Sequence, residues 1–187
     1  HLDELIGQSH LVGRGAVLRR MIDSGRIPSI ILWGPPGVGK TTLANIIANT
    51  LNAPFYKLSA INSGVKDVRE VIEKAKNNRF FESSAPILFI DEIHRFSKSQ
   101  QDSLLNAVET GIVTLIGATT ENPSFEVIRP LLSRCQVYVL KPLDKKELEQ
   151  LLNRALNEDF ILKERKIEVK ETDALFRFSG GDARKLL

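Results

Sequence analysis

The sequence has little of several residue types, and each shortage excludes a class of protein. It contains one cysteine, Cys135, which excludes an internal disulfide framework and a zinc site built from several thiolates. No apolar run approaches the 18 or more residues of a transmembrane helix. The first residues have neither the basic nor the apolar region of a secretory signal peptide. We therefore expect a reduced, cytoplasmic protein with no membrane partner, in which Cys135 is a small buried side chain.

An excess of one charge is also missing. Lys and Arg total 26 and Asp and Glu total 23, for a net charge of +3. So small an excess does not indicate nucleic-acid binding by itself, because a DNA footprint is a clustered patch. The composition, 42% hydrophobic and 26% charged over 187 residues, is typical of a globular chain with one domain or slightly more.

Short apolar segments alternate with longer helical patterns along the first three quarters of the chain. The expected strands are residues 29–33, 54–58, 86–91, 112–118 and 136–140. Several of them are nearly continuous apolar runs, which are typical of strands buried on both faces of a parallel sheet. Apolar residues at helical spacing lie between them, in 41–51, 65–75 and 104–108. This alternation predicts an α/β domain with a five-stranded parallel sheet sandwiched by helices.

The pattern changes after residue 140. A break at 141–143 is followed by a helical pattern with Asp144 as its cap, and two further helical pieces, 172–178 and 182–187, are separated by Gly180 and Gly181. We therefore predict one domain over residues 1–140 and a small helical domain over 141–187. Because the last residues continue a helical pattern, we expect this second domain to be incomplete.

Residues 34–41, Gly-Pro-Pro-Gly-Val-Gly-Lys-Thr, match the phosphate-loop pattern between an expected strand and an expected helix. Glycines and the helix N-terminus let backbone N–H groups cradle phosphates. Lys40 is expected to reach the outer phosphates, and the Thr41 hydroxyl to coordinate Mg²⁺. The nucleotide-binding candidates are Gly34, Pro35, Pro36, Gly37, Val38, Gly39, Lys40, Thr41 and Thr42.

A buried strand ends in two acids, Asp91 and Glu92. The carboxyl end of a parallel strand is where ligands bind, so Asp91 is a second candidate ligand for Mg²⁺. Glu92 is suited to polarise an attacking water. A small-molecule kinase has no use for such a base, so the pair favours hydrolysis of ATP.

These motifs resemble those of AAA+ ATPases of the clamp-loader and RuvB branch. Three further segments, 91–102 (Asp-Glu-Ile-His-Arg-Phe-Ser-Lys-Ser-Gln-Gln-Asp), 117–126 (Gly-Ala-Thr-Thr-Glu-Asn-Pro-Ser-Phe-Glu) and 132–135 (Leu-Ser-Arg-Cys), sharpen the resemblance. With them the chain is most similar, over essentially its whole length, to the family of replication-associated recombination ATPases and eukaryotic Werner-helicase-interacting ATPases.

The resemblance implies further site residues. Ile6, in the segment 5–8, corresponds to the part of this branch that contacts adenine. Thr119 resembles the sensor-1 residue that positions water and the γ-phosphate, with Thr120 and Asn122 as competitors because the following loop is longer than in RuvB or clamp loaders. Arg134 resembles an arginine finger that acts on the ATP of a neighbouring subunit.

The resemblance also implies a lid and a biological role. The helical domain corresponds to the lid, in which Arg184 resembles the sensor-2 residue that contacts the γ-phosphate in the same subunit. The implied protein is a homo-oligomeric, nucleoid-associated bacterial ATPase that uses Mg-ATP on DNA ends, stalled forks or single strands, together with replication or repair proteins. Lys66 and Arg69 are candidate DNA phosphate contacts. His94 has no companion at metal-ligand spacing, so a zinc site there is not expected.

Three alternatives stay open at this point. The chain could be part of a clamp-loader subunit, part of a RuvB-like branch-migration motor, or a nucleotide-dependent switch that hydrolyses little ATP. The long loop after Thr119 argues against the first two, and the intact phosphate loop and acidic pair argue against the third.

Overall fold

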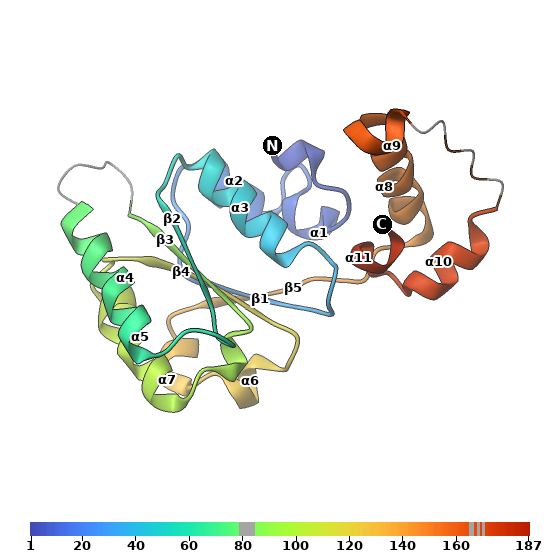
Figure 1. Ribbon diagram of the computed structural model, residues 1–187. Helices are drawn as coiled ribbons and strands as arrows, with labels where there is room; N and C mark the ends of the chain where they lie inside the picture. The colour runs from blue at the N-terminus through green and yellow to red at the C-terminus, as the bar shows by residue number, and fades with distance from the viewer. Residues whose placement is uncertain (79–84, 165–166, 168, 170) are drawn as a thin grey trace.

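The computed structural model describes residues 1–78, 85–164, 167, 169 and 171–187. Its centre is a parallel sheet in the order β2-β3-β4-β1-β5 (Figure 1). The strands are β1 (Ile30–Trp33), β2 (Phe55–Ser59), β3 (Ile87–Asp91), β4 (Thr114–Thr119) and β5 (Gln136–Val139). The predicted five-stranded parallel sheet is therefore confirmed, and the expected strand bounds differ from the observed ones by at most two residues.

Helices cover both faces of the sheet. Successive strand residues point to opposite faces, and in β1 the residues of both faces are apolar and buried. Ile30 and Leu32 of β1 pack into one hydrophobic cluster with α2 and α3, whereas Ile31 packs into another with α4, α5 and α7. The helices of the first face are α1 (Ser9–Val12), α2 (Val17–Asp23) and α3 (Lys40–Thr50). Those of the second face are α4 (Val65–Asn78), α5 (Lys98–Glu109) and α7 (Arg129–Leu132). Short helical turns complete the domain: η1 (Leu2–Glu4), η2 (Ile93–Arg95) and α6 (Pro123–Glu126).

The order of the strands positions the site. β4 lies between β1 and β3, with Trp33 paired to Thr119 and Ile90 paired to Gly117. The loop after β1, the turn after β4 and the acidic end of β3 therefore meet at the same edge of the sheet. In an open parallel sheet, ligands bind outside the carboxyl ends of the strands.

The helical part after β5 has its own apolar cluster. It contains α8 (Lys145–Glu158), α9 (Phe160–Glu164), α10 (Asp173–Ser179) and α11 (Ala183–Leu186). Of these, α8, α10 and α11 contribute to the cluster, whose buried side chains are Leu143, Leu148, Leu152, Phe176 and Leu186. The predicted cap is confirmed: the Asp144 carboxylate accepts a hydrogen bond from the Glu147 N–H, and the Glu147 carboxylate accepts one from the Asp144 N–H. The division at residues 140 and 141 stays a prediction, which this separate cluster supports.

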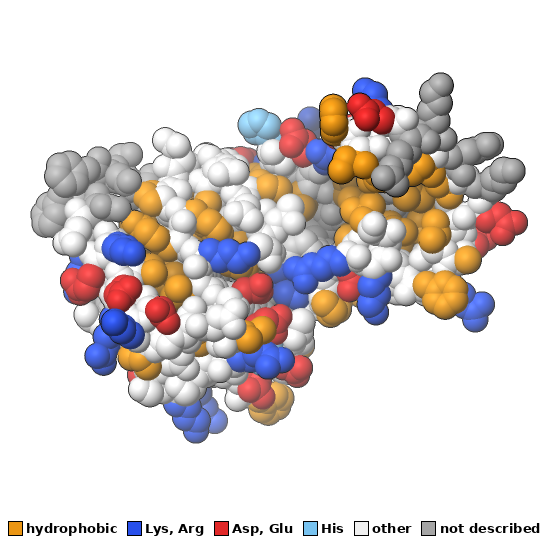
Figure 2. Space-filling model, viewed as in Figure 1, with side chains coloured by type: hydrophobic (Ala, Val, Ile, Leu, Met, Phe, Trp, Pro, Cys, Tyr) orange, Lys and Arg blue, Asp and Glu red, His pale blue; other side chains and the backbone are white. Residues whose placement is uncertain are grey.

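Hydrophobic side chains also gather on the surface of this helical part (Figure 2). The exposed ones include Phe160, Ile161, Leu175 and Phe178. Cys135, by contrast, packs partly buried against the core of the α/β part, and burial raises the pKa of its thiol to about 12. Such a thiol is inert at neutral pH. Within the part of the chain that the structure describes, no helix is long and apolar enough to cross a membrane.

Candidate nucleotide-binding site

The loop 34–39 leads from the end of β1 into α3 and has the backbone of a phosphate cradle. Gly37 and Gly39 have φ angles of 70° and 95°, in the left-handed region that favours glycine. Gly39 is the N-cap of α3 and has no side chain to bond the first N–H groups of the helix. Those N–H groups, with the positive end of the helix dipole, form a ready anion site.

Lys40, the first residue of α3, is held back over this loop. Its side chain is buried, and its Nζ donates hydrogen bonds to the carbonyl oxygens of Gly34 and Pro35, at 2.6 and 2.8 Å. Burial lowers the pKa of Lys40, and the negative charges of Glu92 and Asp91 partly offset that effect. A bound phosphate would add negative charge beside the ammonium and favour its charged form. The lysine therefore fits a polyphosphate ligand.

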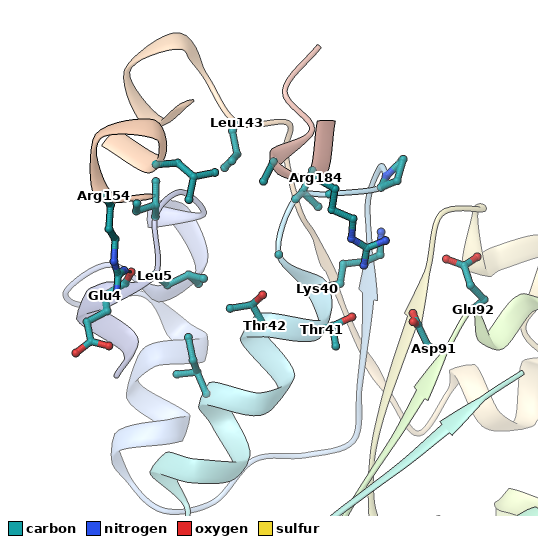
Figure 3. A pocket seen from close by; sticks show the side chains of 18 of the residues that line it. Glu4, Leu5, Lys40, Thr41, Thr42, Asp91, Glu92, Leu143, Arg154 and Arg184 are labelled. Atoms are coloured by element: carbon teal, nitrogen blue, oxygen red, sulfur yellow. Dashed lines mark hydrogen bonds between the residues drawn. The ribbon is translucent and has the colours of Figure 1, made fainter. Parts of the chain in front are cut away.

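A cavity of about 600 Å³ opens over the loop, within the roughly 300–1,000 Å³ of ordinary ligand sites. Its lining brings together most of the residues predicted from sequence: Ile6, Pro36, Gly37, Val38, Gly39, Lys40, Thr41, Thr42, Asp91, Glu92 and Arg184. Figure 3 shows Arg184 reaching from α11 toward Lys40, with Asp91 and Glu92 facing both from the end of β3. Gly34 and Pro35 are absent from the lining and take part through their bonds to Lys40.

The acidic pair diverges because the backbone bends sharply after Asp91. Glu92 has a φ of 56°, a left-handed conformation that is uncommon for a residue with a side chain. Its Oε2 accepts a hydrogen bond from the Thr120 Oγ1 at 3.4 Å and lies 3.3 Å from the His94 Nδ1. The same His94 nitrogen lies 3.0 Å from the Thr119 Oγ1. Glu92 thus ends a short polar network that ties β3 to the end of β4.

This network bears on which residue is sensor 1. Thr119 is fully buried and does not line the cavity, and its hydroxyl also bonds the backbone of Glu121. Asn122 uses its side chain to cap α6. Of the three candidates, Thr120 is the one that the structure brings into hydrogen-bond contact with Glu92. Thr120 and Asn122 are absent from the cavity lining as well, so the contact with Glu92 is what distinguishes Thr120, and the identity of sensor 1 stays a prediction.

Arg134 lies away from the cavity of its own chain. It follows α7, is about 39% exposed at its side chain, and forms an ion pair with Glu109. It also donates to the carbonyl oxygen of Pro130. A half-exposed guanidinium outside its own site fits a residue that acts on a neighbouring subunit, and its role stays a prediction.

Sequence reasoning missed most of the apolar end of the cavity and found Leu5 only as part of the segment 5–8 that the resemblance implies. Leu5, Ile46, Leu143 and Leu151 line it, and Arg154 of α8 closes it by donating to the carbonyl oxygen of Glu4 at 2.8 Å. Leu151 belongs to an ordinary amphipathic stripe of α8, so no sequence signal separated it from core positions.

The sequence led us to consider His94 only as a metal ligand. Among the described residues, no group of three or more His, Cys, Asp or Glu side chains could hold a metal ion.

The candidate DNA contacts lie elsewhere, on α4. Lys66 and Arg69 are both exposed and are absent from the cavity lining. The Lys66 Nζ is 4.0 Å from a Glu70 carboxylate oxygen, and Asp67 and Glu73 share the helix. The surface of α4 is therefore of mixed charge, and these two contacts stay predictions.

Residues 30–143 match the family described as AAA, the ATPase family associated with various cellular activities. Over its full length the chain is 50% identical to the replication-associated recombination protein A of Haemophilus influenzae, and it covers 42% of that protein. It is 49% identical, over 98% of its length, to the ATPase WRNIP1 of Dictyostelium discoideum and covers 21% of it. The structure of the RuvB Holliday junction branch migration motor of Thermotoga maritima is similar, with a TM-score of 0.76, 30% identity, and coverage of 99% of this chain and 61% of that chain. The chain thus spans less than half the length of these sequence relatives.

Proposed function

The chain belongs to the AAA family of ATPases, and on that premise we propose that it binds ATP with Mg²⁺ in the cavity over loop 34–39 and hydrolyses it. One observation carries the proposal. The fold gathers the phosphate loop, the buried Lys40, the acidic end of β3 and Arg184 around one cavity of suitable size, although they are far apart in sequence.

In this proposal each side chain has one task. Lys40 and the N–H groups at the start of α3 bind the phosphates. The Thr41 hydroxyl and the Asp91 carboxylate would hold Mg²⁺, which neutralises phosphate charge when bound. Glu92 accepts the proton of the water that attacks the γ-phosphate, and Arg184 contacts that phosphate from the lid. Ile6 and the apolar end of the cavity accommodate the base.

We further propose that Arg134 completes the site of a neighbouring copy. A guanidinium beside the transferring phosphoryl group stabilises the charge that spreads in the transition state, and such a residue contributes about 10³–10⁵ in rate. Its position outside its own cavity supports action between subunits and therefore a homo-oligomer.

A mixing experiment tests the shared site. In the full-length protein, Arg134→Ala and Lys40→Ala should each abolish most ATP turnover. Mixed together they should regain part of it, because an intact Arg134 from the Lys40→Ala copy can serve the intact cavity of the Arg134→Ala copy. Phosphate release is measured across mixing ratios, and Arg129→Ala, at an exposed arginine of α7 close to Arg134 in the chain, is the matched control. A mixture with no more activity than its components would contradict the shared site.

We propose what the ATPase acts on from the names of its sequence relatives. Proteins named for replication-associated recombination share about half of this chain's residues, so we propose action on DNA at stalled forks, ends or single-stranded regions, with replication or repair proteins as partners, in the bacterial cytoplasm and nucleoid. The resemblance implies a longer loop after Thr119 than in RuvB or clamp loaders, and on that expectation we propose neither a RuvB-like motor nor a clamp-loader subunit.

ATPase rates with different DNA forms test this role. We expect the full-length protein to be faster with forks, ends or single strands than with no DNA or closed duplex circles. Strongest stimulation by a four-way junction would instead indicate a RuvB-like motor, and stimulation that requires a sliding clamp would indicate a clamp loader. Tight ATP binding with no turnover under any condition would identify a switch. Equal rates under all conditions would contradict coupling to DNA.

A further inference from the structure

Gln8 is a buried polar residue that lies outside the cavity lining and has no part in the proposed chemistry. Only 4% of the surface of Gln8 is exposed. Its Nε2 donates to the Lys141 carbonyl oxygen at 2.7 Å and to the Val38 carbonyl oxygen at 3.3 Å, and its Oε1 accepts from the Lys141 N–H at 3.0 Å. One side-chain amide thus joins two backbone segments that are about a hundred residues apart in the chain.

The two segments are the phosphate loop and the start of the connection to the lid. Val38 lies in loop 34–39, and Lys141 lies near the start of the stretch between β5 and α8. The turn that carries Gln8 is pressed against that stretch, since a Cβ on Gly7 would meet the Leu143 Cδ2 at 2.4 Å. Gly7 and Gln8 both have positive φ angles, 85° and 60°. This backbone conformation places the side-chain amide of Gln8 against the stretch between β5 and α8.

A second contact joins the phosphate loop to the lid itself. The Ala183 N–H, at the start of α11, donates to the Gly37 carbonyl oxygen at 3.1 Å. The approach is close, because a Cβ on Gly37 would meet the Asp182 Oδ1 at 1.7 Å. Two consecutive carbonyls of the loop, Gly37 and Val38, therefore bond to α11 and to Gln8. The next residue of α11, Arg184, is the one that reaches toward Lys40 (Figure 3).

We propose that Gln8 is a positioning residue that sets the lid relative to the phosphate loop and thereby places Arg184 over the outermost phosphate. The inference rests on the proposed ATP site. Without the amide, the Lys141 N–H and two carbonyls lose their partners, and the connection at 141–143 can rotate. Arg184 would then sample positions away from the nucleotide, although every group that touches the nucleotide is still present.

This role predicts a selective effect on nucleotide affinity. If Gln8 acts through Arg184, its loss weakens binding of ATP, whose third phosphate Arg184 contacts, more than binding of ADP. A role in the general stability of the N-terminal segment would weaken both nucleotides alike. The ratio of the two dissociation constants therefore separates positioning from folding.

The test uses Gln8→Glu and Gln8→Met in the full-length protein carrying Glu92→Gln, so that ATP is bound and not consumed. Gln8→Glu keeps the acceptor and sets a carboxylate oxygen against two carbonyls, whereas Gln8→Met keeps the length without polar atoms. Gln150→Glu, at an exposed position of α8, is the matched control. Cysteines replacing Lys74 and Lys146, exposed on α4 and α8, carry spin labels that report the distance between core and lid.

We expect both Gln8 variants to lose about tenfold in ATP affinity, the size of about one hydrogen bond between Arg184 and the outermost phosphate, and less than about threefold in ADP affinity. Their core-to-lid distance distribution with ATP should broaden, and the control should match the parent in both measurements. Equal losses for ATP and ADP, or unchanged ATP affinity with an unchanged distance distribution, would overturn the proposal. A parent protein that binds no ATP would refute the proposed function instead.

Discussion

Glu92→Gln is expected to leave ATP bound and unhydrolysed. Glutamine keeps the shape of the side chain and can still bond Thr120, but it cannot accept the proton of the attacking water. General-base catalysis typically contributes 10²–10⁴ in rate, so phosphate release from the full-length protein should fall by about that factor. The dissociation constant of Mg-ATP should stay within about threefold of wild type, because Lys40 and the phosphate loop are unchanged.

Glu126→Gln is the matched control, because Glu126 is exposed on α6 and is absent from the cavity lining. It should hydrolyse ATP at the wild-type rate. Glu92→Gln protein that turns over ATP near the wild-type rate would remove Glu92 from its proposed role and direct attention to the polar groups beside it, His94 and Thr120.

Lys40→Ala should lose nucleotide binding itself. Lys40 is buried and oriented by the carbonyl oxygens of Gly34 and Pro35, so its ammonium is already in place for the phosphates. Removing one partner of a desolvated charge pair costs about 2–5 kcal/mol, which corresponds to a loss of affinity of at least about thirtyfold. Titration calorimetry with Mg-ATP measures it.

The pH dependence of this binding has a definite sign. The protonated lysine binds phosphate, so affinity falls as pH rises through the pKa of Lys40. Because burial lowers that pKa, the fall should begin at lower pH than for an exposed lysine, and bound phosphate should move it upward. Lys98→Ala, an exposed lysine at the start of α5, should change neither affinity nor its pH profile. Undiminished ATP binding by Lys40→Ala would place the nucleotide elsewhere.

The strands and long helices could be predicted because each carries its own pattern. β1 and β3 are continuous apolar runs between breaks, and α8 begins at a capping box that reads directly from Asp144 and Glu147. The short helices α1, α2, α6, α7 and α9 were missed, because four to seven residues show little of a helical period, whereas the equally short α11 is marked by the break at Gly180 and Gly181. Contacts with the rest of the fold hold them in place.

The site also contains parts that a local sequence pattern predicts and parts that depend on the fold. Loop 34–41 and the pair Asp91 and Glu92 are contiguous, so their chemistry could be predicted from spacing alone. The contact of Thr120 with Glu92 depends on β3 and β4 being neighbours in the sheet, which no local pattern specifies. The bridge from Gln8 to Lys141 spans most of the chain and was invisible before the fold was known.

Arg134 and Arg184 illustrate two degrees of dependence on the fold. α11 brings Arg184 to the lining of the cavity of its own chain, and its proposed contact with the γ-phosphate can be made within that chain. Arg134 lies outside that cavity, where it pairs with Glu109, and its proposed task needs a second copy of the protein. The mixing experiment addresses the second case, and the Gln8 variants address the first.

ATP should bind in one cavity and be hydrolysed there with Glu92 as the base. Single-turnover hydrolysis tests this most directly: full-length wild-type and Glu92→Gln proteins are loaded with radiolabelled ATP, started with Mg²⁺, and sampled for bound ATP, ADP and phosphate. We predict that wild type converts its bound ATP to ADP and phosphate while Glu92→Gln retains ATP over the same period. Equal rates of conversion in the two proteins would contradict the role of Glu92. If neither protein retains ATP, before or after Mg²⁺ is added, the cavity is not the ATP site.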